Sequence, residues 1–383
     1  MRAAYNIYTK PGTESTMWHN AIPNPITFKG IFEIGPTDRR KDEAAPLQAE
    51  GTSWNVLLPM CDGDVTPLSG VRSFDRMMGL TSETPTTMKS TYTVWGANHN
   101  FYNTEWQQVE NEAICVGRAN SGAQLWSSGA TASTSQQQTG LASVLALIRG
   151  NVGAGADSNF NKNFNPRYGL PSVVTSVTKV DRGFMPSPDS VYNLVGEDFT
   201  QAISTDLCAA GSGDECSGGA TATVSLVPEH DDTLHAASIN WLSSGSNTYY
   251  QTNWAAAGAG TDVSNFLNLD FRISRQSNQI TVDAERTTFS MQLVLANGLS
   301  APVSLCKYTD LRGPVGVFRC VNNPGSGCTQ YMTFLHSILQ TVRIPLADFG
   351  NVDLTKVRGV RFSFNNTSSG SIYVANIRFT RGQ

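Results

Sequence analysis

Two polar turns follow predicted strands, and their residue types could perform acid–base chemistry. CDGDV at 61–65 follows the apolar run VLLPM, and GANHNFYN at 96–103 follows the β-branched and aromatic run YTVW. In an open parallel sheet, functional residues lie where strands end at their carboxyl side. The chain between Asp62 and His99 is long enough for one helix and one returning strand. A carboxylate after one strand and a histidine after the next can form the part of a catalytic triad that takes a proton from serine.

Each of these residues also has a plain structural interpretation. Asp62 and Asp64 both lie in the first turn, and Asp64 could instead cap the next helix or brace the loop. His99 could be a histidine bonded only to neighbouring backbone. Its neighbours Gly96 and Asn98 suit a tight loop at a strand end, which favours the functional interpretation of His99.

The segments that must position these turns alternate between strand and helix through residues 1–150. Apolar runs at 26–38, 54–65 and 90–100 predict buried strands. Apolar residues at helical spacing predict helices over 68–80 and 139–153. This alternation predicts a mostly parallel sheet with helices on its faces, which is an α/β architecture.

The pattern changes in the second half of the chain. A Gly- and Asn-rich stretch at 151–170 predicts a linker. From 171 to 383, short segments alternate apolar with polar residues between Gly, Asn, Asp or Ser clusters, as in ATATVSLV and VRGVRFSFN. This pattern is typical of an all-β sandwich or jelly-roll domain.

The first 150 residues resemble the α/β-hydrolase superfamily, and most closely bacterial secreted serine hydrolases of esters. The resemblance rests on CDGDV, on GANHNFYNTEW and on the predicted helix QTGLASVLALIR. It implies a Ser–His–Asp triad in which His99 is the base. Because the superfamily often shows Asp-x-x-Val after this strand, it also implies that Asp62 is the acid and Asp64 the alternate.

The nucleophile of that family is missing from this sequence. No Gly-x-Ser-x-Gly motif occurs in the 383 residues. In the family the motif directly precedes a helix that resembles RAAYNIYT, and the oxyanion-hole donors also lie upstream. The start of the chain has the apolar spacing of a helix interior with no capping residue before it. We therefore expect residues 1–150 to be the C-terminal part of a hydrolase domain, with its serine upstream and little activity alone.

Seven cysteines indicate an oxidising compartment, and their odd number leaves one without a partner. Cys208 and Cys216 enclose a short loop and are expected to pair. Cys61 and Cys115 flank the two functional turns, so a bridge between them would hold that face together; Cys61 could equally pair with an upstream residue. A third set predicts one bridge and one leftover thiol: Cys306, Cys320 and Cys328.

Other polar and aromatic residues receive structural interpretations. The segment PEHDDTLH looks like a metal cluster, but solvated turn chemistry is favoured for His230, Asp231, Asp232 and His235. No zinc or calcium consensus is present, so neither a metal nor a cofactor is expected. The remaining candidates are interpreted as surface acids or core residues: Asp38, Glu105, Glu110, Glu112, His19, His336, Trp95, Trp106 and Trp126.

Composition restricts the partners and the location. Charged residues make up 15% of the chain and the net charge is -4, so no basic field attracts nucleic acid or an anionic membrane. No apolar run is long enough to span a membrane, and no signal peptide is present. The cysteines and the β-rich second half are typical of a secreted or periplasmic protein.

The second half also resembles non-catalytic jelly rolls of the carbohydrate-binding type, most strongly in TVRIPLADFGNVDLTKVRGVRFSF and the strand that follows. Two functions are therefore predicted. The first is a hydrolase of carboxylic esters, lipids or polyesters that works through Asp62 and His99. The alternative is a module that binds a polysaccharide or polymer, carried on a catalytically inactive hydrolase remnant.

Overall fold

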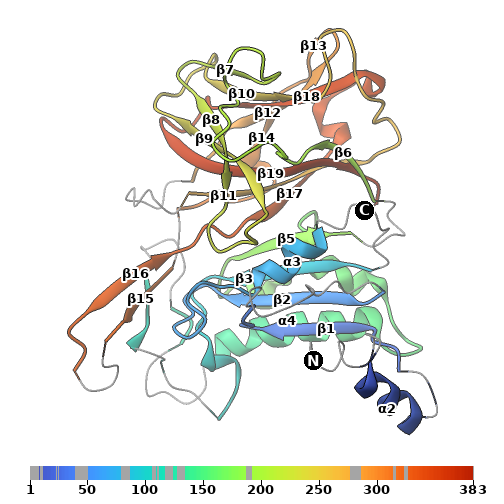
Figure 1. Cartoon of the computed structure of the whole chain (residues 1–383), viewed down its shortest axis with the longest axis vertical. Coiled ribbons are helices and arrows are strands. Elements are labelled where there is room, and N and C mark those ends of the chain that lie inside the picture. The colour runs from blue at the N-terminus through green and yellow to red at the C-terminus, as the bar shows by residue number, and fades with distance from the viewer. Residues whose placement is uncertain are drawn as a thin grey trace.

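The computed structural model describes residues 8, 12–22, 24, 26–38, 51–78, 87–105, 109, 112–116, 124–126, 134–186, 192–276, 286–313, 316–322 and 327–382. Within these ranges the chain forms one four-stranded, two six-stranded and one three-stranded sheet. In Figure 1 the four-stranded sheet with its helices fills the lower part, and the two six-stranded sheets lie above it. Of the expected opening helix, only Tyr8 lies within the described residues.

The four-stranded sheet has the order β1-β2-β3-β5. Its strands are β1 (Gly30–Ile34), β2 (Ser53–Pro59), β3 (Lys89–Val94) and β5 (Val180–Met185). The parallel pairing predicted for the first 150 residues is confirmed for β1 with β2 and for β2 with β3. Strand β5 runs antiparallel to β3 and forms the other edge.

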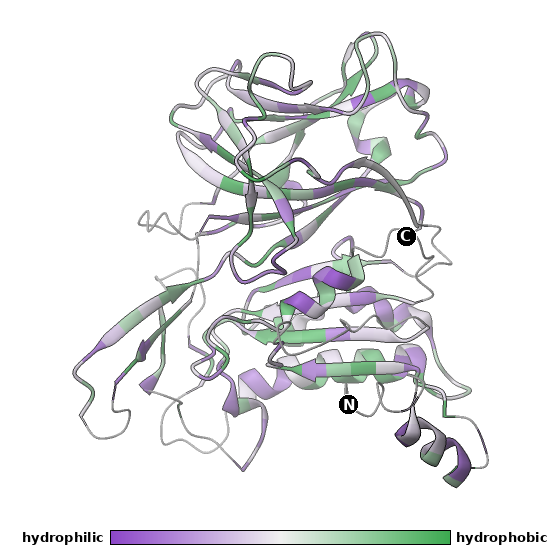
Figure 2. Cartoon of the chain, viewed as in Figure 1, coloured by the Kyte–Doolittle hydropathy of each residue, from purple (hydrophilic) through white to green (hydrophobic). Residues whose placement is uncertain are grey.

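Two helices, α3 (Val71–Met78) and α4 (Thr134–Asn151), cover opposite faces of this sheet, which explains why every residue of β2 is buried. The other helical elements that precede β5 are α2 (Thr13–Ala21), α5 (Ser172–Thr175) and the short 3₁₀ turns η2 (Asn100–Tyr102) and η4 (Ser158–Asn163). Val56 and Leu58 pack with Val71 of α3 on one face. Leu57, whose side chain points the other way, packs with Leu147 of α4. Figure 2 shows hydrophobic residues along β1, β2 and α4.

The two six-stranded sheets pack face to face as a β-sandwich, which confirms the all-β architecture predicted for the second half. We call them the lower and upper sandwich sheets after their places in Figure 1. The lower sheet contains β6 (Tyr192–Glu197), β8 (Thr221–Leu226), β9 (His235–Trp241), β11 (Asn268–Arg275), β17 (Gln340–Pro345) and β19 (Gly370–Thr380). The upper sheet contains β7 (Glu215–Ser217), β10 (Tyr249–Asn253), β12 (Ser290–Leu295), β13 (Gly298–Leu299), β14 (Val303–Ser304) and β18 (Val357–Ser363).

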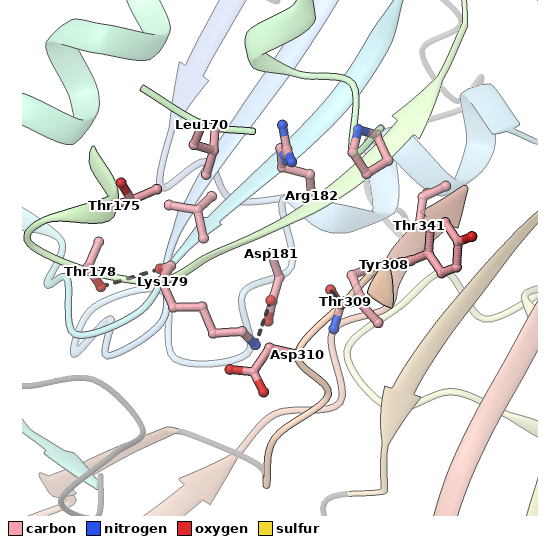
Figure 3. Close-up of a pocket in the computed structure, with 13 residues that line it drawn as sticks. Leu170, Thr175, Thr178, Lys179, Asp181, Arg182, Tyr308, Thr309, Asp310 and Thr341 are labelled. Atoms are coloured by element: carbon pink, nitrogen blue, oxygen red, sulfur yellow. Dashed lines mark hydrogen bonds and ion pairs between the residues drawn. The ribbon is translucent and has the colours of Figure 1, made fainter. Parts of the chain in front are cut away.

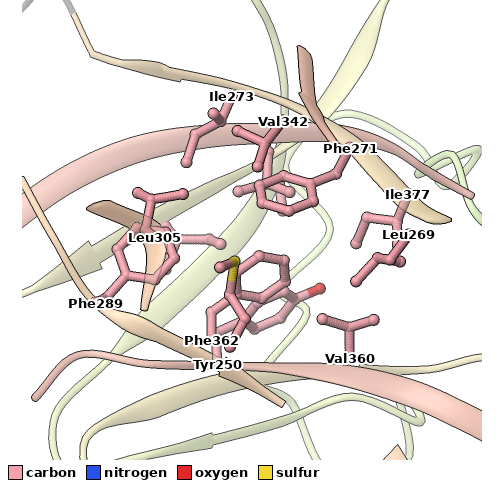
Figure 4. Packing of buried hydrophobic residues seen from close by; sticks show 14 of the residues in the cluster. Tyr250, Leu269, Phe271, Ile273, Phe289, Leu305, Val342, Val360, Phe362 and Ile377 are labelled. Carbon is pink, nitrogen blue, oxygen red and sulfur yellow. The ribbon is translucent and has the colours of Figure 1, made fainter. Parts of the chain in front are cut away.

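The core of the sandwich is made of side chains from the inner faces of both sheets. Phe271 and Val342 from the lower sheet meet Tyr250 and Phe362 from the upper sheet, as Figure 4 shows. The ring centroids of Phe271 and Phe362 are 5.6 Å apart and nearly perpendicular. Three short 3₁₀ turns connect its strands: η6 (Leu305–Lys307), η7 (Leu346–Phe349) and η8 (Leu354–Lys356).

A three-stranded sheet joins the two halves of the chain. The hairpin β15 (Gly316–Cys320) and β16 (Tyr331–Leu335) comes from the second half, and β4 (Ile114–Val116) from the first half pairs antiparallel with β15. The two halves therefore share backbone hydrogen bonds as well as side-chain contacts.

The residues on either side of the expected boundary at 171 pack against α4 of the first half and then enter its sheet as β5. The 3₁₀ turn η4 within the expected linker packs against α4, and Phe164 just after it is fully buried. The segment PSVVTSVTKV forms α5 and leads into β5, although its alternation favoured a sandwich strand. The domain limits 1–150, 151–170 and 171–383 remain predictions, and β5 pairs with β3 across the expected boundary.

Buried charged residues connect α3 to the lower sandwich sheet. Asp75 of α3 accepts a hydrogen bond from Arg272 of β11 at 2.7 Å and from the His230 Nδ1 at 2.8 Å. The backbone N–H of Leu339 donates to the His230 Nε2 at 3.0 Å, so the proton of this imidazole lies on Nδ1. Burial raises the pKa of Asp75, but its partners His230 and Arg272 outweigh burial and hold that pKa well below its ordinary value of 3.8.

Replacing Asp75 by Asn should destabilise the fold, because Arg272 would be left buried without its carboxylate. We expect the free energy of unfolding at neutral pH to fall by about 3–5 kcal/mol. Urea unfolding measures this, with the exposed Asp198→Asn as a control that should change it by less than about 0.5 kcal/mol. The stabilisation by Asp75 is present above pH 3.8 and is lost as the pH falls below that value. An Asn variant with wild-type stability, or with an unchanged acid-induced loss, would contradict this assignment.

Candidate catalytic dyad

The carboxyl ends of β2 and β3 bring the two predicted turns together. The backbone N–H of Met60 bonds to the Val94 carbonyl at 3.0 Å, and that of Cys61 to the Ala97 carbonyl at 2.9 Å. These bonds continue the parallel ladder past the last paired residues, so the turns that follow the two strands lie side by side. Asp62 and His99 are therefore brought into contact, as the strand-end argument predicts.

Asp62 is fully buried, and hydrogen-bond donors surround its carboxylate. Its Oδ1 accepts from the backbone N–H of Asp64 at 2.8 Å and of Val65 at 2.7 Å. Its Oδ2 lies 2.8 Å from the Nδ1 of His99. These three hydrogen bonds satisfy the buried carboxylate and hold the imidazole in one orientation.

Asp64, the alternate acid, occupies a different position. Its side chain is 65% exposed, and its Oδ2 lies 3.9 Å from the Nε2 of His99, beyond hydrogen-bond distance. The Asp64 backbone instead helps to fix the Asp62 carboxylate. The geometry therefore favours Asp62 as the acid.

The loop of His99 is held by residues that the sequence did not single out for this role. The buried side chain of Asn98 donates to the Cys61 carbonyl at 3.4 Å. Gln136 of α4 exchanges two hydrogen bonds with the backbone of Asn98, at 2.9 and 2.6 Å. Gln136 lies on the buried side of α4 together with Thr139 and Ser143, and no local pattern in the sequence marks its contact with Asn98.

Gly35, at the end of β1, leaves room for the imidazole. Its φ of 52° is in the left-handed region, and a Cβ there would lie 2.7 Å from the Nδ1 of His99 and 3.3 Å from the Oδ2 of Asp62. No side chain fits that space without displacing the histidine or its acid. Gly35 therefore contributes to the site, which strand patterning alone did not reveal.

This arrangement can relay a proton. Nδ1 of His99 faces Asp62, so the proton held in that bond leaves Nε2 on the opposite side of the ring as the basic nitrogen. The His99 side chain is 24% exposed. No Gly-x-Ser-x-Gly motif supplies a nucleophile within the sequence, and the described residues contain no group of three metal-ligating side chains.

Three disulfides lie in the described part of the chain. Cys61–Cys115 joins the residue beside Asp62 to β4, and Cys208–Cys216 and Cys320–Cys328 close short loops. Cys306 is free and exposed. These pairs confirm the expected bridges, including the leftover thiol, and they are typical of a protein from an oxidising compartment. No helix in the described ranges is long and apolar enough to cross a membrane.

Several other predicted positions have structural roles that differ from the expected ones. His230 and Asp231 are buried in the contact with α3 and are not solvated turn residues, because Asp75 and Arg76 pair with them from far away in the sequence. Asp38 is also buried and pairs with Arg76, so the interpretation as a surface acid was wrong.

The remaining predicted positions are structural. The Nδ1 of His235 contacts the Phe199 carbonyl, and that of His336 lies 3.8 Å from the Glu229 carboxylate. His19 stacks on Tyr8, and Trp126 stacks on Phe101. Trp95 is hydrogen-bonded to Asp181, and Glu112 is hydrogen-bonded to Tyr331. Glu105 and Asp232 are exposed. Trp106 and Glu110 lie outside the described residues.

Comparison with known proteins gives similarities of fold alone. No protein-family model and no curated protein matches the sequence. Among solved structures, the chain is similar to a family 11 carbohydrate-binding module of a cellulosomal cellulase of Clostridium thermocellum, with 17% identity and a TM-score of 0.29 over 50% of this chain and 97% of the module. It is also similar to a family 30 carbohydrate-binding module, with 14% identity and a TM-score of 0.27 over 50% of this chain and 87% of that one.

A third similarity is to an exo-β-agarase, with 13% identity and a TM-score of 0.29 over 50% of this chain and 25% of that enzyme. These neighbours are carbohydrate-binding modules and a glycoside hydrolase, and they offer no support for an ester hydrolase. At such TM-scores they assign no function, so the functional argument rests on the geometry.

The position of the imidazole proton distinguishes the two candidate acids. We expect nitrogen NMR shifts to place the His99 proton on Nδ1, because Asp62 accepts it there. Asp62→Ala should give a mixture of both tautomers, whereas the matched control Asp64→Ala should leave Nδ1 protonated. A proton on Nε2 in the unmodified chain, or a change caused only by Asp64→Ala, would refute Asp62 as the acid.

Proposed function

We propose that this chain supplies the acid and the histidine of a carboxylic ester hydrolase, for which ester, lipid and polyester substrates are the candidate classes. The observation that carries the proposal is the 2.8 Å contact between the His99 Nδ1 and the fully buried Asp62 carboxylate. The serine lies outside these 383 residues in this proposal, and the protein acts outside the cytoplasm, in the secreted or periplasmic space.

The proposed chemistry follows from the two ends of the imidazole. Nε2 removes the proton of the serine hydroxyl as its oxygen attacks the ester carbonyl, and then returns that proton to the leaving alcohol. Asp62 stabilises the imidazolium that exists between these two transfers. A water molecule repeats the cycle on the acyl-enzyme and releases the acid.

Two features of the surface support a larger sheet around the dyad. β1, whose end contributes Gly35, lies at one edge of the four-stranded sheet in the described residues. The outward face of α4 is apolar, with Leu141, Leu145 and Ile148, and with Val152 directly after the helix, between 48% and 68% exposed. An unpaired edge strand of a parallel sheet beside a helix with an exposed apolar face is unusual on a protein surface. Both features fit a further strand and helix, supplied by other polypeptide, that would cover them.

Ester hydrolysis should depend on polypeptide beyond these residues. On a short-chain nitrophenyl ester we expect no His99-dependent turnover from the 383 residues alone. Joined to upstream polypeptide with a Gly-x-Ser-x-Gly motif, the protein should be active, and Asp62→Asn should lower kcat by roughly 10⁴-fold. Asp64→Asn is the matched control, with a far smaller effect. Turnover by the 383 residues that His99→Ala abolishes would contradict an external serine, and an extended protein insensitive to Asp62→Asn would contradict the dyad.

The second candidate function is the binding of a polysaccharide by the β-sandwich, as in the carbohydrate-binding modules named above. The observation that favours it is a polar platform on the outer face of the upper sandwich sheet, which we define as Arg361, Gln292 and Tyr249; the neighbouring Gln251 is buried and accepts a hydrogen bond from the Arg361 guanidinium. The strand register places Gln251, Arg361 and Gln292 in one row across β10, β18 and β12. The Arg361 guanidinium lies 3.8 Å from the centroid of the Tyr249 ring, and its Nε donates to Gln251 at 2.8 Å.

Such a platform suits a sugar chain. Planar amide and guanidinium groups can exchange hydrogen bonds with neighbouring hydroxyls, and an aromatic ring packs against the C–H face of a sugar. The lower sandwich sheet offers no such surface along β11, because all eight of its residues are buried. A glycan is therefore directed to the upper sheet.

Retention on insoluble polysaccharides tests this second function. We expect the full chain to be retained on at least one of cellulose, mixed-linkage glucan, agarose or xylan, and Arg361→Ala to weaken retention about tenfold or more. Lys356→Ala removes an exposed positive charge outside the platform and should have no effect. Equal losses in both variants would indicate nonspecific charge attraction, and no retention on any of the polymers would reject the function.

A further inference from the structure

A cavity of about 230 Å³ lies at the junction between the first sheet and the sandwich (Figure 3). One wall is formed by Thr175 and by the start of β5 with the residue before it, and the other by the segment 308–310 and the start of β17. We call it the junction cavity. It shares no lining residue with the dyad or with the polar platform.

The ammonium group of Lys179, a residue of the cavity wall, is paired with a carboxylate. The Nζ of Lys179 lies 2.7 Å from the Oδ1 of Asp181 and 4.0 Å from the centroid of the Trp95 ring. The indole N–H of Trp95 donates to the other oxygen of Asp181 at 2.7 Å. Figure 3 shows Lys179 directed toward Asp181 and Asp310. Lys179 and Asp181 together therefore contribute no net charge to the cavity.

The two other charged residues of the wall are also satisfied. Asp310 forms ion pairs with Arg286, at 2.9 Å, and with Arg312. The guanidinium of Arg182 donates to three backbone carbonyls, those of Asn163, Asn165 and Tyr168. An ionic ligand would have to displace one of these partners, so the cavity favours a neutral ligand.

The strand edge beside the cavity offers backbone hydrogen-bond groups. The N–H of Phe184 points away from β3, since it donates to the Thr341 hydroxyl of β17 at 2.9 Å. Alternate residues of a strand direct their backbone groups to the same side. The N–H and C=O groups of Val180 and Arg182, both in the cavity wall, therefore also face away from β3, toward the cavity.

Side chains add neutral donors and apolar contacts. The Thr309 hydroxyl donates to the Gln340 Oε1 at 2.6 Å, which orients the amide and leaves its Nε2 as a donor. Thr175 places an exposed hydroxyl at the wall, and Leu170 and the Tyr308 ring supply apolar surface. Mixed neutral donors and acceptors beside apolar patches match a molecule that carries several hydroxyls on a C–H skeleton.

We propose that the junction cavity binds one neutral sugar unit. Its volume is slightly below the roughly 300–1,000 Å³ of pockets for larger ligands, which fits a single ring. Val180 pairs with Val94, the last residue of β3, so the cavity lies at the end of the sheet where the dyad also lies. The dyad follows β2 and β3, which lie two strands and one strand away from β5. Neither Asp62 nor His99 lines the cavity, and the proposal depends on neither ester hydrolysis nor the polar platform.

Titration with glucose, galactose, mannose, xylose and arabinose, followed by ligand-observed NMR and calorimetry, tests the proposal on the full chain. We expect at least one of these sugars to bind and Thr175→Trp to weaken it at least tenfold, because the indole fills the exposed side of the cavity. Ser176→Trp is the matched control: Ser176 is also exposed but does not line the cavity, so binding should be unchanged. Circular dichroism checks that both variants fold.

Three results would overturn the assignment: no binding of any neutral sugar, equal binding by the unmodified chain and Thr175→Trp, or clearly tighter binding of glucuronate or glucosamine than of glucose. Arg361→Ala separates this site from the polar platform. We expect it to leave the titration unchanged, and loss of sugar binding in Arg361→Ala alone would assign the sugar to the platform.

Discussion

The parallel pairing of β2 with β3 is the constraint on which the candidate dyad depends. This pairing places the carboxyl ends of the two strands next to each other. The backbone hydrogen bonds from Met60 and Cys61 to the carbonyls of Val94 and Ala97 extend the ladder into the turns. Asp62 then meets His99 with its second oxygen already bound by two backbone N–H groups. A slip of one residue would turn each side chain to the opposite face and separate the pair.

Charge compensation determines how the two halves of the molecule meet. The outer face of the lower sandwich sheet carries Arg272, Arg343 and Arg378, which are ordinarily surface residues, yet each is at most 2% exposed. Asp75, Asp270 and the Phe184 carbonyl are their respective partners. Buried charges are tolerated only when they have partners. The two halves must therefore meet in the one relative placement of α3 and β5 against the sandwich that supplies these partners. The junction cavity lies between the start of β5 and the start of β17, beside the hydrogen bond from Phe184 to Thr341.

Local patterns in the sequence identified the features that depend on local periodicity. Apolar runs located β1, β2 and β3, alternation indicated the sandwich, and residue types at strand ends drew attention to Asp62 and His99, which lie in contact. Sequence-based prediction was wrong where a partner lies far along the chain. PEHDDTLH reads as a solvated turn because nothing near it predicts Asp75, 155 positions away from His230. The polar composition of 151–170 favours a linker, which stays a prediction; Phe164 in that stretch is fully buried.

By itself, the sequence predicted β1, β2 and β3, the all-β architecture of the second half, and a carboxylate and an imidazole at two strand ends, because these properties follow from local periodicity and local chemistry. Only the tertiary structure placed Asp62 rather than Asp64 against His99, placed Gly35 and Gln136 beside that pair, and buried His230 against Asp75. Those outcomes depend on distances between residues remote in the chain, and such distances are set by strand register and by packing between layers.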